Sequence, residues 1–416
     1  MDHQLQGGLS RRSFLKGAGV AAAAVAGSAA LAGCASGAEA AADDWMPKNW
    51  DYECDILVVG YGGAGMWASL IGADECGQSV LVLEKAPVRG GGNSSINNGE
   101  FAIINDAEGM RQYWHEMTQD VDTPSEVIDA WIEEGLRNCE YADKYDLEYD
   151  INEKAIAGTI PEYSFLPGGA GCQSIADPPG FGMASFEILD QKRKDLGVDV
   201  LFDCHDEHLI QNPTTKEIVG CTVTIGSEEK TVKARKGTIL CTGGFEFNED
   251  MKRKYLKCYP FKFEGWKYNT GDGIRMTEEV GGKLWHMGLA GAMYGMWTRD
   301  PENDFLVLMM PSDQTFIYTD RLGKRWVDET RIGSPHNGWH AFTHFSDEIC
   351  DYDHCPSWCV FDQTLFESGP LSTVRAIGSS AATSHHAARR AARLGRLVGR
   401  QPGRGGQGMD HQGRHA

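Results

Sequence analysis

The sequence lacks a surplus of basic residues, a long hydrophobic run and a regular cysteine pattern. Its 416 residues carry a formal net charge of −20, which argues against nucleic acid as a partner. The main apolar stretch, residues 17–32, is mostly alanine and too short to span a membrane. Apart from Cys34, eleven cysteines are scattered along the chain, an odd number that does not indicate a disulfide framework. No C-x-x-C-H sequence occurs, so the chain attaches no c-type haem.

The cysteine-rich segment at residues 350–359 does not match a metal-binding motif. Cys350, His354, Cys355 and Cys359 lie close together, but their spacing fits no common zinc or iron–sulfur pattern. We interpret them as half-buried thiols and predict no metal site, with a metal cluster as the alternative.

What the sequence does have is a glycine-rich turn after an apolar segment. Residues 56–59, Ile-Leu-Val-Val, predict a strand buried in a parallel sheet. They run into GYGGAG at residues 60–65, which has G-x-G-x-x-G spacing. Gly60 permits a tight turn, Gly62 lets the backbone approach a pyrophosphate, and Gly65 lets a helix pack against the strand.

The residues after the turn complete a nucleotide-binding unit. A helix predicted around residues 66–73 directs its positive N-terminal end at the phosphates. A second apolar strand, Val80–Leu83, ends at Glu84, where an acid can bind ribose hydroxyls. Strand, glycines, helix, strand and acid in this order favour a dinucleotide site over a chance glycine-rich turn.

Three further segments decide which dinucleotide is expected. Glu84-Lys85 is followed by GGGNSS at residues 90–95, then by CTGGF at 241–245 and NTGDGIRM at 269–276. Over roughly residues 51–366 the chain resembles the fumarate reductase and succinate dehydrogenase flavoprotein family. The resemblance implies an α/β fold, with a Rossmann-like FAD-binding domain made of a parallel sheet and a small antiparallel β layer. It also implies an inserted α+β cap domain that closes over the flavin and forms the substrate site.

This resemblance favours FAD over NAD and assigns its binding residues. A histidine that carries covalent flavin in some relatives would fall at or beside Asn93-Ser94, where none stands, so we expect non-covalent FAD. The implied FAD-binding residues are Gly60, Gly62, Gly63, Ala64, Gly65, Glu84, Lys85, Gly91, Gly92, Asn93, Ser94, Thr242, Gly243, Gly244 and Asp272.

The amino terminus predicts export. SRRSFLK at residues 10–16 fits the twin-arginine signal, which makes the twin-arginine translocase a partner; the alternative is a frayed alanine-rich helix. Residues 31–34, Leu-Ala-Gly-Cys, resemble a lipobox, so we expect Cys34 to be lipidated and to anchor the protein on the outer face of the membrane. Ordinary cleavage near residues 38–40, which would give a soluble exported protein, is the alternative.

The last residues differ in composition from the rest. Residues 373–416 contain eight arginines, no lysine and a single acid. We expect this tail to be disordered and to derive from DNA read out of frame; a basic tail that binds nucleic acid or anionic lipid is the competing interpretation. The family completes its FAD and substrate sites with C-terminal motifs that are not found here. The predicted divisions are a signal with lipobox (1–34), a tether (35–50), the FAD-binding domain (51–284), a partial cap (285–371) and the aberrant tail (372–416).

Several other elements follow from local patterns. Thr123-Pro124-Ser125-Glu126 predicts a capping box with proline at the first helical position. A helix is expected over residues 183–196, a strand over 198–202 and a hairpin from 217–225 and 230–234. The helix that begins at this proline is predicted to pack into the core through Val127, Ile128, Trp131 and Ile132.

The cap region departs from the family at the positions that handle fumarate. Residues 316–329 and 358–362 resemble its strands, but the proton-donor arginine would fall on Gly333. The nearest arginine, Arg331, is our predicted catalytic residue; a surface ion pair beside Glu329 is its alternative. The substrate clamp would fall on Met309 and Ser312, which cannot hold a carboxylate as guanidinium does, so we do not expect fumarate as the substrate. The cap histidines, His286, His336, His340 and His344, are interpreted as structural or surface residues, with acid or substrate donor as the alternative.

Three functions fit these observations. The first is an exported FAD-dependent reductase of a carbon–carbon double bond in a small organic acceptor, supplied with electrons by a membrane or cytochrome partner. The second is a flavin dehydrogenase of the ketosteroid-dehydrogenase type, which resembles the same family. The third is a truncated, non-catalytic flavin-binding fragment.

Overall fold

The computed structural model describes residues 45–97, 99–118, 123–152, 165–169, 173–179, 181–263, 265–291, 295–297, 306–308, 315–329 and 338–368. The predictions for the signal, Cys34, Arg331 and the tail concern residues outside these ranges. Within them, no helix has the length and apolarity that crossing a membrane requires.

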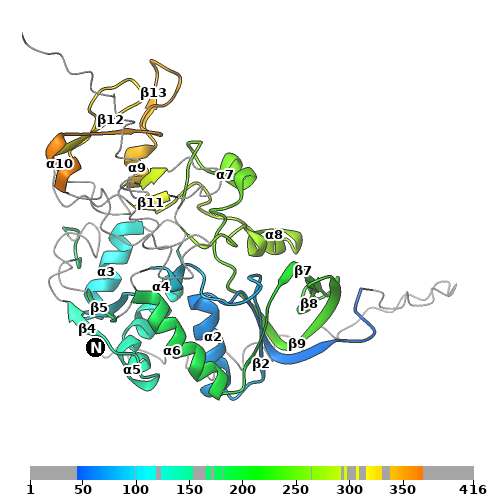
Figure 1. Cartoon of the computed structure of the whole chain (residues 1–416). Coiled ribbons are helices and arrows are strands. Elements are labelled where there is room, and N and C mark those ends of the chain that lie inside the picture. Colours follow the sequence, from blue (N-terminus) through cyan, green and yellow to red (C-terminus); the bar gives the residue numbers. More distant parts are fainter. Residues whose placement is uncertain are drawn as a thin grey trace, which may run out of the picture. The chain divides into compact units, whose positions relative to one another are not determined.

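The strands around the glycine turn form the centre of a six-stranded sheet (Figure 1). Strand β1 (Tyr52–Val59) lies between β2 (Val80–Leu83) and β9 (Glu228–Leu240), and both pair with it in parallel. The register matches Val59 with Leu83 and with Leu240, so the three strands end at one edge of the sheet. The residues that follow the strands therefore come together there, as the carboxyl ends of parallel strands do in nucleotide-binding folds.

The predicted antiparallel hairpin is present, but it is part of this sheet and does not form a separate layer. Strand β9 is 13 residues long; its first half pairs antiparallel with β8 (Ile218–Ile225) and its second half parallel with β1. Strand β7 (Cys204–Gln211) extends the sheet beyond β8, and β6 (Asp199–Leu201) extends it beyond β2. Because β9 is long enough to pair with β8 and with β1, it joins the antiparallel and the parallel parts of the sheet.

Both faces of β1 and β2 are buried, as predicted for their continuous apolar sequences. Val58 and Val82 pack with residues of α2 (Gly63–Asp74) and α6 (Phe181–Asp195) on one face. Leu57, Val59, Leu81 and Leu83 face the other way, toward β7, β8 and the α8 helix (Asp272–Glu279). Side chains alternate between the two faces because successive residues of a strand point in opposite directions.

A smaller sheet and three helices lie between β2 and α6 in the sequence. The capping box predicted at Thr123 is not formed: α4 has Pro124 as its N-cap and no side-chain cap bond. Ile128 and Ile132 lie four residues apart on a buried side of the helix, whereas Val127 and Trp131, also four apart, are exposed. These elements are η1 (Asn93–Ser95), β3 (Phe101–Ile104), α3 (Ala107–Thr118), α4 (Ser125–Gly135), α5 (Asn138–Lys144), β4 (Asp150–Asn152) and β5 (Gln173–Asp177).

The region predicted as the cap contains short strand pairs. The two strands expected there, β12 (Phe316–Thr319) and β15 (Trp358–Phe361), pair with each other. A buried cluster packs Leu256 and Cys258 against Trp339 and Phe342, so cap residues share a core with the segment before residue 284. The other elements are α7 (Glu249–Tyr255), β10 (Gly295–Trp297), β11 (Leu306–Leu308), α9 (Gly338–Phe342), β13 (Phe345–Ser346), β14 (Asp351–Tyr352) and α10 (Gln363–Ser368).

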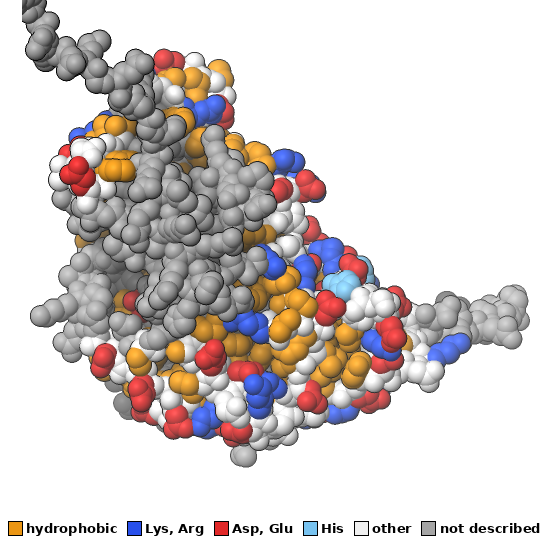
Figure 2. All heavy atoms as spheres, in the orientation of Figure 1, with side chains coloured by type: hydrophobic (Ala, Val, Ile, Leu, Met, Phe, Trp, Pro, Cys, Tyr) orange, Lys and Arg blue, Asp and Glu red, His pale blue; other side chains and the backbone are white. Residues whose placement is uncertain are grey.

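Charged side chains of both signs are intermixed on the described surface shown in Figure 2. That face presents no extended basic patch among the described residues, in line with the acidic composition of the chain.

Candidate functional site

The site is built on the turn between β1 and α2, whose glycines have distinct geometric roles. Gly60 adopts a φ of +98°, and a Cβ there would lie 2.4 Å from the carbonyl oxygen of Cys241. A Cβ on Gly65 would approach the Gly60 carbonyl oxygen to 1.9 Å, so only glycine lets the helix come this close. A Cβ on Gly62 would lie at an ordinary contact distance, 3.6 Å from the Gly92 Cα. The tight turn and the close helix contact agree with the predicted roles of Gly60 and Gly65.

The first turn of α2 is arranged to receive an anion. Gly62 is the N-cap and provides no side-chain cap, and the first turn contains no acid. The helix therefore begins with amide groups that no capping side chain satisfies and with the positive end of its dipole. Gly62, Gly63 and Ala64 line a cavity of about 640 Å³, within the usual size range of ligand sites.

The GGGNSS segment packs directly across this turn. The amide of Gly91 donates to the carbonyl oxygen of Tyr61 at 2.7 Å. A Cβ on Gly92 would come within 3.1 Å of the Gly62 Cα, so the two glycine segments are in close backbone contact. The resemblance alone implied that these segments act on one ligand, and the structure brings them to the same cavity.

Glu84 is held rigidly beside the glycine turn. Its side chain is buried; Oε2 accepts from the Tyr61 amide at 2.8 Å and Oε1 from the Ala86 amide at 2.7 Å. Burial raises the pKa of Glu84 even though both amide bonds favour the charged form. The amides fix the rotamer, and each oxygen keeps a lone pair that can accept from a hydroxyl group.

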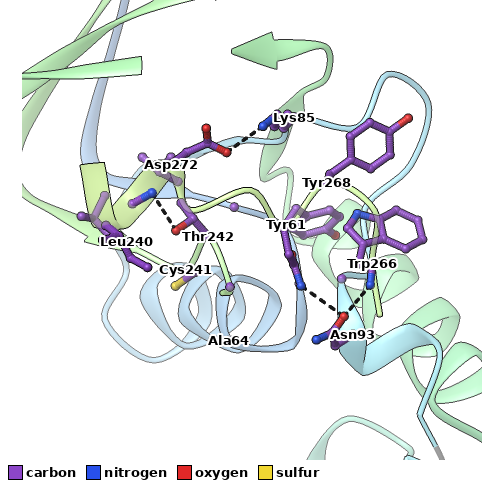
Figure 3. A pocket seen from close by; sticks show the side chains of 18 of the residues that line it. Tyr61, Ala64, Lys85, Asn93, Leu240, Cys241, Thr242, Trp266, Tyr268 and Asp272 are labelled. Atoms are coloured by element: carbon purple, nitrogen blue, oxygen red, sulfur yellow. Dashed lines mark hydrogen bonds and ion pairs between the residues drawn. The ribbon is translucent and has the colours of Figure 1, made fainter. Parts of the chain in front are cut away.

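Lys85 and Asp272 meet across the cavity mouth although 187 residues separate them (Figure 3). Lys85 Nζ lies 2.8 Å from Asp272 Oδ2 and also donates to Thr270 Oγ1. Both charged side chains are about three-quarters buried. The pair therefore places one positive and one negative charge next to the space open to a ligand.

The CTGGF segment supports the start of α8. Thr242 Oγ1 accepts from the amide of Gly273 at 3.1 Å and thereby caps this helix (Figure 3). Gly243 has a φ of +72°, and a Cβ there would lie 2.7 Å from Asn269 Oδ1. Thr242 and Gly243 line the cavity and also position its neighbouring helix.

Asn93 is the centre of a polar cluster at the other end of the cavity. Its Oδ1 accepts from the Trp266 amide at 2.6 Å and from Asn269 Nδ2 at 3.2 Å. Its Nδ2 donates to Glu246 Oε1 at 2.9 Å. These bonds hold the segment at residues 266–269, and with it Trp266 and Tyr268, against the cavity (Figure 3).

Twelve of the fifteen predicted FAD-binding residues line the cavity. Gly65, Gly91 and Gly244 do not line it; they stand behind the lining, where neighbouring atoms leave no room for a side chain. Sequence reasoning also missed several lining residues. Tyr61 and Asn269 lie within segments already recognised, whereas the others have no motif of their own. The principal ones are Tyr61, Glu207, Trp266, Tyr268, Asn269 and Lys283.

Buried polar atoms without a partner support a polar ligand in this cavity. Among the described residues, Glu207 Oε2, Glu246 Oε2 and Trp266 Nε1 are buried and make no hydrogen bond. Glu207 and Trp266 line the cavity, and Glu246 bonds to Asn93, which does. Such atoms are costly unless a ligand satisfies them, so the donor and acceptor set fits a dinucleotide rich in hydroxyl, amide and phosphate groups.

The predicted catalytic residue Arg331 lies outside the described residues, as do Met309, Ser312 and Gly333. The described acid Glu329 is engaged by another arginine, because Arg325 Nη2 lies 2.6 Å from its Oε2.

Two of the four cap histidines can be placed. His286 stacks on Trp285 with ring centroids 3.5 Å apart. His344 pairs with Asp353. Neither lines the cavity, although the neighbours of His286, Trp285 and Met287, do.

Comparisons with known proteins identify the family of this chain and its cofactor. The profile of a family described as FAD binding domain matches residues 55–354, and that of the twin-arginine translocation pathway signal matches residues 8–28. These matches confirm the predictions of FAD and of a twin-arginine signal.

Relatives with known functions are flavin oxidoreductases of more than one kind. A 3-oxosteroid 1-dehydrogenase of Mycolicibacterium smegmatis is 26% identical over 392 residues, which cover 75% of this chain and 68% of the relative. Digoxin reductase of Eggerthella lenta is 26% identical over 328 residues, 67% of this chain and 56% of the relative. A probable fumarate reductase of Shewanella frigidimarina is 27% identical over 328 residues, which cover 76% of this chain and 52% of the relative. This chain thus spans between about half and two thirds of these relatives.

Solved structures show the same fold at low sequence identity. A 3-ketosteroid Δ1-dehydrogenase from Sterolibacterium denitrificans superimposes with a TM-score of 0.65 at 19% identity, over 80% of this chain and 73% of that one. The open conformation of a flavocytochrome c3 fumarate reductase gives 0.57 at 19% identity, over 77% and 54%. The predicted α/β fold with a parallel sheet is confirmed.

Proposed function

Because the chain belongs to the FAD binding domain family, we propose that it is an exported flavoenzyme that reduces a carbon–carbon double bond in a small organic acceptor. The observation that carries this proposal is the convergence of the glycine turn, Glu84-Lys85, the GGGNSS segment, Thr242-Gly243 and Asp272 on one cavity. FAD, when bound there, supplies a hydride at flavin N5.

The chain's own residues bind and orient the cofactor. The amides at the start of α2 receive the pyrophosphate, and Glu84 accepts from the adenosine ribose hydroxyls. The bonds of Asn93 hold Trp266 and Tyr268 along the cavity, where their rings exclude water. With no histidine at or beside residues 93–94, FAD is held without a covalent bond.

The acceptor we propose is larger and less charged than fumarate. Trp266, Tyr268 and Trp285 give one side of the cavity aromatic character, and aromatic faces favour apolar or conjugated groups. Relatives named fumarate reductase, digoxin reductase and vinyl phenol reductase support the proposal of an acceptor other than fumarate.

Steady-state assays define the direction of the reaction. Under anaerobic conditions with reduced viologen, the purified protein should oxidise the dye when given an unsaturated acceptor from a panel containing fumarate, acrylate, a vinyl phenol and a cardenolide. A Gly62→Val variant, which we expect to lack flavin, is the control for dye oxidation that does not depend on flavin. If no acceptor on the panel supports dye oxidation by flavin-loaded protein, the reductase proposal fails.

A dehydrogenase is the second candidate, because 3-oxosteroid 1-dehydrogenases are among the relatives and the ketosteroid dehydrogenase superimposes well. This reaction would transfer hydride to the flavin and pass electrons to an acceptor. Turnover of a 3-oxosteroid with an artificial electron acceptor, without turnover in the viologen assay, would favour it.

We assign the proton-donor role to Arg331, which lies two residues before Gly333, the position where the family's proton-donor arginine would fall. Arg331→Gln should remove turnover while flavin content and the pH dependence of flavin binding stay unchanged. Arg325→Gln is the matched control, since Arg325 is an exposed arginine that pairs with the buried side chain of Glu329, and this variant should retain activity. Equal activities of the two variants would exclude Arg331.

Export and anchoring are tested separately. Arg11→Lys with Arg12→Lys should keep folded protein in the cytoplasm, because the translocase recognises the arginine pair. We propose that Cys34 is lipidated, so Cys34→Ala should release the exported protein from the membrane fraction. Unchanged membrane association of the Cys34→Ala protein would favour another anchor.

The proposed electron donor is a membrane or cytochrome partner.

A further inference from the structure

A cluster of two histidines and one aspartate lies at the ends of the β13–β14 hairpin, away from the nucleotide cavity. The antiparallel register matches Phe345 with Tyr352, so the preceding His344 lies opposite the following Asp353. His354 comes next in the chain. One potential ligand atom from each of these three side chains lies within 4.8 Å of the other two. None of the three residues lines the nucleotide cavity.

Two imidazole nitrogens face the same carboxylate oxygen. His344 Nδ1 lies 2.8 Å from Asp353 Oδ1, and His354 Nε2 lies 3.5 Å from it. The side chains of Asp353 and His354 are 7% and 11% exposed, whereas that of His344 is 57% exposed. The cluster therefore has a fixed, buried side and a side open to solvent.

The hydrogen bond of His354 to the backbone determines which nitrogen can bind a cation. His354 Nδ1 lies 2.7 Å from the carbonyl oxygen of Ala341, and a carbonyl can only accept, so Nδ1 carries the proton. In the neutral ring, Nε2 then presents its lone pair toward the Asp353 carboxylate. A cation bound between these two electron-rich atoms would remove the repulsion between them.

The surroundings of His354 match those of metal-binding histidines. Such histidines usually donate their second ring nitrogen to a carbonyl or carboxylate, which fixes the tautomer and the ring orientation. Trp326 stacks on the His354 ring with centroids 3.8 Å apart, which holds His354 in place. His344 also stacks on His354, with centroids 4.5 Å apart, so its exposed ring must turn out of this stack before both imidazoles can bind one ion.

We propose that His344, Asp353 and His354 bind one divalent transition-metal ion of the zinc class. Two imidazoles and one carboxylate suit such ions, which prefer nitrogen ligands over the all-oxygen sets of Ca²⁺ and Mg²⁺. An ion can enter on the side of His344, whose side chain is 57% exposed. The ion joins the residue before β13 to the residues after β14, so it stabilises the hairpin ends. The cysteines at 350, 355 and 359 are not members of the site, which is why the cysteine spacing gave no prediction of it.

Zinc binding to the full-length, flavin-loaded protein tests the proposal. The sequence contains 13 histidines and 12 cysteines, so the readout is the difference between variants and not the total metal content. After chelator treatment and dialysis against Zn²⁺, the wild type should retain one more ion per chain than His354→Gln, and the affinity of this site should fall more than about tenfold in that variant. His205→Gln is the matched control, because its Nδ1 also contacts a backbone carbonyl, that of Asp203.

Two further measurements keep the test decisive. Co²⁺ should give the wild type a ligand-field band without thiolate charge transfer, and His354→Gln should lose this band. Zn²⁺ should raise the unfolding temperature of the wild type and of His205→Gln but not of His354→Gln. If His354→Gln does not fold, the exposed His344→Gln takes its place. Equal zinc retention, cobalt spectra and thermal shifts in the wild type and the folded variants would show a hydrogen-bonded imidazole–carboxylate cluster without metal and overturn the proposal.

Discussion

Helices α2 and α8 both begin after a glycine at the edge of the central sheet, and both line the nucleotide cavity, but their first turns differ. The first turn of α2 has no acid and no side-chain cap. The first turn of α8 contains Asp272, and Thr242 Oγ1 accepts from the amide of Gly273. The chain has thus supplied α8 with its own anion and its own cap, while α2 keeps both functions available for a ligand.

The difference shows what makes a helix N-terminus an anion site. The dipole and the free amides are present at the start of every helix, but they attract a ligand only where the protein has not already satisfied them. Lys85 adds to the contrast, because it neutralises Asp272 at α8. The following variants test this comparison, beginning with the largest expected effect.

Gly62→Val should abolish retention of FAD by α2. The Cβ would make an ordinary contact, 3.6 Å from the Gly92 Cα, so the fold should survive. We expect the branched side chain to occupy space that the phosphates require. We expect flavin content to fall at least about tenfold, which corresponds to about 1.4 kcal/mol or more. Absorbance of the bound flavin measures it. Gly237→Val, at a position with open space, is the control, and normal flavin content in Gly62→Val would refute the assignment.

Thr242→Val should weaken α8 without emptying the site. The substitution removes the hydroxyl that caps the Gly273 amide and should lower the free energy of unfolding by about 1 to 2 kcal/mol. Urea denaturation measures this change. Thr277→Val is the control, because that hydroxyl donates to a carbonyl within the helix, and its loss should cost less. If the free energy of FAD binding falls by more than the free energy of unfolding, Thr242 acts on the cofactor itself.

Glu207→Gln should stabilise the flavin-free protein at neutral pH. Burial raises the pKa of Glu207 above its ordinary value of 4.5, and nearby Asp272 raises it further. A raised carboxyl pKa leaves stability intact below the ordinary value and costs stability as pH rises through the raised one. The variant should therefore match the wild type near pH 4 and exceed it at pH 8 by on the order of 1 kcal/mol.

Glu279, an acid on α8, has a pKa shift of the opposite sign to that of Glu207 on β7 and serves as the control. Burial works to raise the pKa of Glu279, but the bonds with His208 and Arg275 outweigh it and lower the pKa. Glu279→Gln should therefore be less stable than the wild type at pH 8, with the difference lost as pH falls through the lowered value. Thermal unfolding across pH distinguishes the two variants; parallel curves for both would contradict the assignment to Glu207.

Lys85→Met should have the smallest effect. The pair with Asp272 keeps partial contact with solvent, and such ion pairs contribute about 0 to 1 kcal/mol. We expect FAD affinity to decrease a few-fold, mainly because Asp272 then repels the phosphates. Flavin titration at low and high salt measures this, and an equal affinity at both salt concentrations would show that Asp272 does not act through its charge.

Much of the cavity could be predicted because its residues lie in short motifs. Strand β2 has the predicted bounds, and β1 contains the predicted strand. Glu84 lies where the spacing after the glycines placed it. Local patterns were less reliable where two helix faces compete: Val127 and Trp131 share a spacing with Ile128 and Ile132 but are exposed.

The sequence alone determined that the chain has a glycine turn between two buried strands and a twin-arginine signal, because each depends on the spacing of neighbouring residues, and its resemblance to a flavoprotein family indicated FAD. Only the tertiary structure placed Glu207, Trp266 and Tyr268 at the cavity and brought His344 to Asp353. These positions depend on strand register and on contacts between distant segments, which single side-chain patterns do not encode.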